Sequence, residues 1–91
     1  MPIFLIINIP GATTEQYDQV EKGIGEPRLG EGQTYHVAGT TPDGLCVVDV
    51  WESRDHFERF LNERLGEQLQ RAGIQQQPQI TEVTIHNEVR E

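Results

Sequence analysis

The sequence has 91 residues and a formal net charge of −8, from 15 acidic and 7 basic side chains. This length predicts one domain, residues 1–91, with a thin hydrophobic core, and the acidic surface argues against binding to nucleic acid or to an anionic membrane surface. The single cysteine, Cys46, excludes an internal disulfide framework. The N-terminal apolar run is too short to span a membrane and lacks the basic segment of a signal peptide, so we expect a cytoplasmic protein.

The first third of the sequence predicts a strand, a helix and a loop. Residues 3–9 are apolar, rich in β-branched side chains and followed by Pro-Gly, which is typical of a strand with two buried faces. Thr13 and Gln16 have the spacing of a capping box, so a helix should begin there and end by Gly25. Its buried side is predicted to be an apolar stripe of Tyr17, Val20 and Ile24. The polar, glycine-rich residues 26–32 are expected to form a loop.

The rest of the sequence predicts two strands, a second helix and a last strand. Residues 33–39 and 45–51 flank a Thr-Thr-Pro-Asp-Gly turn, so they should form a β-hairpin. Ser53 is placed to cap a helix whose apolar side chains recur at helical spacing, with Gly66 as a point of interruption. Residues 80–86 alternate between apolar and polar side chains, which indicates a strand.

The order strand, helix, strand, strand, helix, strand predicts a ferredoxin-like α+β fold. Both helices of this βαββαβ arrangement should lie on one face of a four-stranded antiparallel sheet. The first and third predicted strands are apolar on both faces, so the face without helices also needs a cover. We therefore expect a homodimer in which two such faces pack together.

The register of the predicted hairpin has two solutions. If the turn closes with four residues, His36 lies opposite Asp49; if it closes with three residues and a bulge, Val37 faces Asp49 and Tyr35 faces Trp51. A slip of one residue moves every side chain of a strand to the other face of the sheet. The sequence thus leaves open either a His36–Asp49 pair or a Tyr35–Trp51 wall.

Asp49 is the polar residue that says most about chemistry, because it stands in an otherwise apolar strand. A buried carboxylate is costly unless it is hydrogen-bonded or protonated, and either state would suit a general acid or base, with His36 as its partner. The alternative is a structural Asp49 bonded to neighbouring groups. Trp51 could likewise be a ligand platform or a core residue, and Asn8 could bind a ligand or only end its strand.

No motif for a metal ion or another cofactor stands out. His36, His56 and His86 are far apart in the sequence, without the HxH or HxxxH spacing of metal sites. There is no glycine-rich phosphate loop between a strand and a helix, and no flavin or nicotinamide motif. We therefore expect neither a metal nor a cofactor.

The stretch Val47 to Ser53, followed by Phe57, Phe60 and Leu61, resembles the third strand and second helix of the dimeric α+β barrel superfamily. This superfamily includes the antibiotic biosynthesis monooxygenase group. The resemblance implies two sheets packed face to face across a dimer axis, and a pocket between sheet and helices in each subunit. Its members include cofactor-independent oxygenases, cyclases, isomerases, haem-degrading enzymes and proteins with no known reaction.

The haem-degrading branch can be tested residue by residue. Its members use an asparagine on the first strand and a tryptophan and a histidine on the second helix. Asn8 matches the asparagine, but Phe60 and Gln70 take the other two positions. Because the axial haem ligand is missing, we do not expect haem degradation by that mechanism.

The resemblance implies a small cofactor-independent enzyme, monooxygenase-like or a cyclase or isomerase, acting on an aromatic or polyketide-like molecule. Asp49 and His36 would be the catalytic residues, and Trp51, Tyr35 and Asn8 would bind the substrate. The alternatives are a non-catalytic domain that binds small molecules and a structural dimer that interacts with other proteins. Whether the chain is an enzyme is left open by the sequence.

Overall fold

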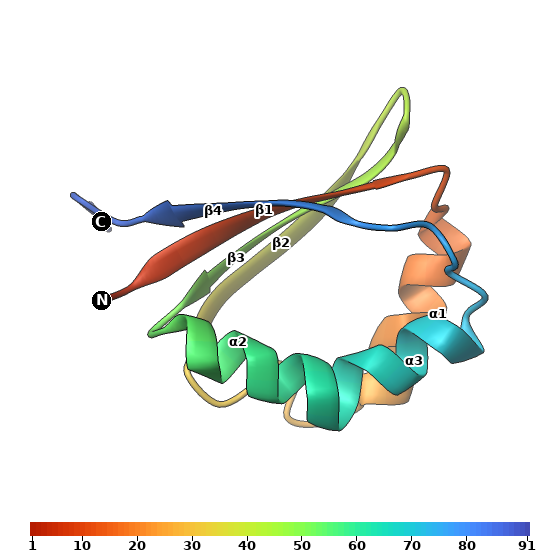
Figure 1. The fold of residues 1–91 in the computed structure, drawn as a ribbon, viewed down its shortest axis with the longest axis horizontal. Helices are drawn as coiled ribbons and strands as arrows, with labels where there is room; N and C mark the ends of the chain where they lie inside the picture. Colours follow the sequence, from red (N-terminus) through yellow and green to blue (C-terminus); the bar gives the residue numbers. More distant parts are fainter.

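A computed structural model describes residues 1–91 as one antiparallel sheet with all helical segments on one face (Figure 1). The strands are β1 (Ile3–Pro10), β2 (Gln33–Thr41), β3 (Gly44–Trp51) and β4 (Gln79–Thr84), in the spatial order β2-β3-β1-β4. The helical segments are α1 (Thr14–Ile24), α2 (Arg54–Phe60), a π-helical turn (Leu61–Leu65) and α3 (Gly66–Arg71). The predicted α+β fold of βαββαβ order, with its helices on one face of the sheet, is confirmed.

Helix α1 begins at the predicted capping box. The Thr13 hydroxyl accepts a hydrogen bond from the Gln16 amide at 3.1 Å, and the Gln16 side chain accepts one from the Thr13 amide at 3.0 Å. Both bonds satisfy amide groups that a helix leaves without partners at its first turn. The helix ends at Gly25, whose φ of 68° is easily reached only by glycine.

The hairpin of β2 and β3 adopts the register with the four-residue turn. Thr41 pairs with Gly44, and His36 therefore lies opposite Asp49. A Cβ atom on Gly44 would lie only 2.4 Å from the carbonyl oxygen of Ile9, so glycine is needed where the turn lies against the end of β1. A bulge at Thr34 keeps Gln33 opposite Trp51 at the other end of the hairpin.

The sequence suggested that Gly66 interrupts the second helix, but the helix continues through this residue. A π turn over Leu61–Leu65 leads directly into α3. The amide of Gly66 donates to the carbonyl of Leu61, five residues earlier, which is the hydrogen bond of a π-helix. On an uninterrupted α-helix, Leu69 would lie about 120° away from Phe57 around the axis. The one extra residue in the π turn reduces this rotation by about 100°. Leu65 and Leu69 therefore lie on the same side of the helix as Phe57, which is the side that faces the sheet. None of the helices combines the length and the apolar character that crossing a bilayer would require.

The two faces of the sheet are buried to different degrees. On the helix-facing side, the apolar residues of β1 and β3 form the core with Phe57: Ile3, Leu5, Ile7, Ile9, Leu45, Val47 and Trp51. The opposite side is also apolar but is only half-buried at Phe4, Ile6, Val48 and Val50, and Tyr35 and Val37 are 49% and 44% exposed there. Within one chain, therefore, the prediction of two buried faces for the first strand holds for one face only.

Candidate functional site

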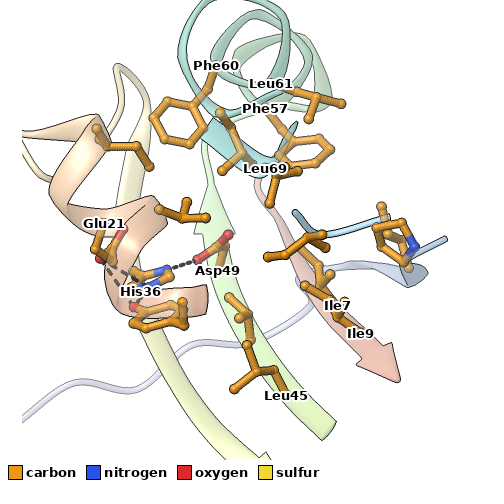
Figure 2. Close-up of a pocket in the computed structure, with 18 of the residues that line it drawn as sticks. Ile7, Ile9, Glu21, His36, Leu45, Asp49, Phe57, Phe60, Leu61 and Leu69 are labelled. Atoms are coloured by element: carbon orange, nitrogen blue, oxygen red, sulfur yellow. Dashed lines mark hydrogen bonds and ion pairs between the residues drawn. The ribbon is translucent and has the colours of Figure 1, made fainter. Parts of the chain in front are cut away.

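A cavity of about 310 Å³ lies between the sheet and the helices (Figure 2). This volume is at the lower end of the range of about 300–1,000 Å³ that is typical of small-molecule sites. Fourteen of the 20 residues that line it are apolar or aromatic, so it suits a largely apolar ligand. The lining residues from the second helix are Phe57, Phe60, Leu61, Leu65 and Leu69. The last two face the cavity because of the π turn.

His36 and Asp49 meet on the wall of the cavity that β2 and β3 form (Figure 2). His36 Nδ1 lies 2.5 Å from Asp49 Oδ1, and the two side chains are 23% and 9% exposed. The second carboxylate oxygen, Asp49 Oδ2, takes part in no hydrogen bond within the protein. The pair therefore has one anchored oxygen and one oxygen without a partner in the protein.

Two residues of α1 extend this pair toward the surface. The Tyr17 hydroxyl lies 2.6 Å from His36 Nε2 and 3.2 Å from Glu21 Oε1, and Glu21 Oε1 is 3.8 Å from His36 Nε2. Arg28, 70% exposed, lies 3.4 Å from the same glutamate oxygen. With His36 protonated, each bond has one donor: Nδ1–H donates to Asp49, Nε2–H donates to Tyr17, and Tyr17 donates to Glu21.

The electrostatics of the site favour a charged histidine and a neutral tyrosine. The hydrogen bond to Asp49 raises the pKa of His36 above 6.5, although burial of the ring opposes this shift. Burial, and then the neighbouring Glu21 carboxylate, raise the pKa of Tyr17 to about 12. Tyr17 therefore acts near neutral pH as a hydrogen-bonding phenol and not as a phenolate.

Gln33 is a further polar residue of the cavity wall that sequence reasoning missed. Asp49 and Gln33 are the two buried polar residues of the chain, at 6% and 8% exposure, and both line the cavity. The Gln33 side-chain oxygen accepts a hydrogen bond from the amide of Gly30 at 2.8 Å. A glutamine at the start of a strand gives no pattern that distinguishes it from an ordinary loop residue.

The three residues expected to bind substrate lie away from the cavity, and this corrects the expectation that they contact a ligand beside Asp49. Trp51 is fully buried against Phe57 and Phe60, with ring centroids 5.7 and 5.4 Å away, and its indole N–H has no partner. Tyr35 and Asn8 lie on strand positions whose side chains point to the helix-free face of the sheet. Trp51 is on the correct face, but it packs beneath the second helix at the end of β3.

Tyr17 and Glu21 were also missed as site residues. Tyr17 was assigned to the apolar stripe of its helix, and its ring does pack against the core. Its hydroxyl, however, meets His36 only when α1 lies across β2, which is a tertiary contact. The one local signal was the spacing of four residues between Tyr17 and Glu21, which places them on the same side of a helix.

The polar side chains of the site form one hydrogen-bonded series. No group of three or more histidine, cysteine, aspartate or glutamate side chains is arranged to hold a metal ion. What the cavity wall offers is a carboxylate, an imidazole and a phenol in one hydrogen-bonded series, next to an apolar space.

No protein-family model matches the sequence, and no curated protein matches it. Among solved structures, the chain is similar to a variant of SnoaB, a cofactor-independent oxygenase from Streptomyces nogalater. The TM-score is 0.66 and the sequence identity is 11%, over 99% of this chain and 97% of that chain. Identity this low leaves the fold as the shared property. The chain therefore shares with that oxygenase an α+β fold of βαββαβ order, with a four-stranded antiparallel sheet.

Proposed function

We propose that this protein is a small cofactor-independent enzyme that removes a proton from an aromatic or polyketide-like molecule bound in the cavity. The observation that carries the proposal is the Asp49 carboxylate in an apolar wall, with Oδ1 fixed by His36 and Oδ2 available to a ligand. The likeness in fold to a cofactor-independent oxygenase supports it.

Asp49 is the base in this proposal. Its Oδ2 takes a proton from an acidic C–H or O–H group, and the ligand keeps the electron pair as an enolate or phenolate. His36 holds the carboxylate in place, and Tyr17 and Glu21 hold His36. An apolar cavity supports this step because it excludes water from the base and from the ligand.

The fate of the ligand anion separates the oxygenase version from the cyclase or isomerase version. In an oxygenase, the carbon of the anion forms a bond to dioxygen, its electron pair reduces the O–O group to a peroxide, and the proton on Asp49 converts this peroxide to a hydroperoxide. In a cyclase or isomerase, Asp49 returns the proton to a different atom of the ligand. Both versions argue against an anionic ligand, because two carboxylates and one imidazole make up the charged groups of the wall.

The proposed enzyme acts as a homodimer. One face of the sheet carries no helix (Figure 1). This face is lined by Phe4, Ile6, Val48 and Val50, and these apolar side chains remain partly exposed in a single chain. Apolar surface of this kind is stabilised by burial against a second copy, and the sheet-to-sheet packing implied by the sequence resemblance supplies that cover.

β-Tetralone is a suitable probe for the proposed reaction, because it is a two-ring ketone with an acidic CH₂ group between its ring and its carbonyl. Proton NMR in D₂O under anaerobic conditions measures how fast this group exchanges its hydrogens. We expect the protein to accelerate the exchange, and Asp49→Asn to reduce that acceleration by about 100-fold or more. Oxygen uptake by the same mixture in air identifies the oxygenase version.

The matched control is Asp18→Asn, which changes an exposed aspartate of α1 and removes the same charge. It should exchange the probe as fast as the wild type. Binding of β-tetralone without accelerated exchange, or equal acceleration by Asp49→Asn and the wild type, would overturn the proposal.

A further inference from the structure

Gln33 is held in one orientation by a reciprocal pair of hydrogen bonds with Gly30. The Gln33 backbone amide donates to the Gly30 carbonyl at 3.0 Å, and the Gly30 amide donates to the Gln33 side-chain oxygen at 2.8 Å. A backbone amide can only donate, so the side-chain atom that it meets must be Oε1 and the free atom must be Nε2. The direction of the Gln33 amide group is thus fixed by chemistry.

The loop that fixes Gln33 is itself packed tightly against the second helix. A Cβ atom on Gly30 would lie 2.6 Å from the Phe60 ring, so the backbone of this residue is in close contact with that side chain. Phe60 also lines the cavity. Gly30 is buried, and its amide is therefore a rigid anchor and not part of a mobile surface loop.

The remaining end of the side chain has no protein partner. Gln33 Nε2 donates to no group of the protein, although the residue is only 8% exposed. Gln33 Nε2 is also not fully enclosed, so part of its surface is open. Because Gln33 lines the cavity, that surface is available to a ligand.

Gln33 also lies close to the proposed base. It pairs with Trp51, and Asp49 is two residues away from Trp51 on the same face of the sheet. Gln33 and Asp49 are thus diagonal neighbours on two paired strands, and the backbones of such residues are about 7–8 Å apart. One or two fused rings can span this distance. A hydrogen-bond donor and an acceptor therefore border the same apolar space.

We propose that Gln33 determines ligand specificity by donating a hydrogen bond from Nε2 to a carbonyl oxygen of the bound molecule. The proposal deepens the proposed function, because it concerns the same cavity and the same ligand. When Asp49 removes a proton next to that carbonyl, negative charge moves onto the oxygen that Gln33 holds. A donor already in place stabilises this charge more than it stabilises the neutral ketone.

The test compares two probes and two proteins. The probes are β-tetralone and tetralin, which has the same two rings without the oxygen, and the proteins are the wild type and Gln33→Glu. The glutamate keeps an oxygen for the Gly30 amide but replaces the NH₂ donor by an acceptor. At about pH 8, where a glutamate carboxyl is normally ionised, dissociation constants measured by calorimetry give the four affinities.

We expect Gln33→Glu to weaken β-tetralone binding by about tenfold and to change tetralin binding by less than about twofold. Equal losses for both probes would mean that the substitution only disturbs the loop, and no loss for either would mean that Nε2 meets no ligand; both results overturn the proposal.

A second measurement does not depend on the variant. The side-chain amide resonances of Gln33 in the wild type should shift with β-tetralone and not with tetralin, and equal shifts would contradict the proposal. Accelerated exchange of β-tetralone by the wild type tests the proposed function separately. The two ideas can therefore fail independently.

Discussion

Replacing Asp49 by asparagine should weaken the His36 pair without emptying the space that the carboxylate fills. Asparagine has nearly the same shape, and its carbonyl oxygen can still accept from His36 Nδ1 at the position where Asp49 Oδ1 lies, 2.5 Å away. A hydrogen bond to a charged group contributes about 1.5–3 kcal/mol and a neutral one about 0.5–1.5 kcal/mol. The loss is therefore about 1–1.5 kcal/mol.

Solvent screens this interaction only weakly, since the side chains of His36 and Asp49 are only 23% and 9% exposed. For a domain of this size, a loss of 1 kcal/mol lowers the melting temperature by about 4–8 °C. Thermal unfolding followed by circular dichroism should thus show Asp49→Asn melting about 5–10 °C below the wild type near pH 6.

The pH dependence of this loss has a definite sign. In the folded protein the pKa of His36 is raised above 6.5, chiefly by the bond to Asp49. The stability that this shift contributes is fully present below the pKa of the unfolded chain and is lost as the pH rises through the pKa of folded His36. The difference in melting temperature between the wild type and Asp49→Asn should therefore become smaller as the pH rises.

NMR titration of the histidine rings checks the same reasoning directly. The His36 resonance should titrate at lower pH in Asp49→Asn than in the wild type. Asp18→Asn should leave both the His36 titration and the melting temperature unchanged. If Asp49→Asn also left both unchanged, His36 and Asp49 would not be paired in solution.

Three further predictions follow from other parts of the structure. An ultraviolet titration should show one of the two tyrosines ionising at about pH 12, and Tyr17→Phe should remove that step; a step that persists in the variant would contradict the placement of Tyr17. Sedimentation of the wild type should give twice the chain mass of 10.3 kDa, and a monomeric wild type would refute the homodimer. Val48→Lys should give the mass of a single chain, whereas the control Gln70→Lys, on the exposed side of α3, should stay dimeric. Gly44→Ala should destabilise the fold by about 2 kcal/mol, because its Cβ would lie 2.4 Å from a backbone oxygen, while Gly39→Ala in the same hairpin meets nothing within 4 Å and should have a small effect; equal melting temperatures would show that the turn can move aside.

Much of the fold could be predicted because its signals are local. The capping box of Thr13 and Gln16 and the Ser53 cap each depend on residues within one turn of a helix. The strands were recognisable from runs of β-branched residues, and the order of the elements then selected the topology. The π turn was missed although it had a local signal: Phe57, Leu61, Leu65 and Leu69 are spaced four residues apart, and on an α-helix each such step drifts by about 40° around the axis.

The site was only partly predictable because its residues meet through long-range contacts. The same turn sequence allowed either Tyr35 or His36 to share a face with the core, and the turn also packs against Ile9 of another strand, a long-range contact that the local sequence does not show. Tyr17 was recognised as a buried residue, but its bond to His36 requires α1 to lie across β2. Asp49 stood out because a charge in an apolar strand is costly wherever the strand lies.

Because of the π turn, the second helix contains one residue more than an α-helix needs to connect the same two ends. A π turn is equivalent to an α-helix with one inserted residue, and the downstream phase is the same with or without the insertion. A shortened chain that lacked the exposed Asn62 could therefore keep Leu65 and Leu69 against the ligand. Straightening the turn at constant length would instead rotate both leucines by about 100° and remove them from the cavity. The apolar wall of the cavity is thus tolerant of a change in chain length and sensitive to a change in helical winding.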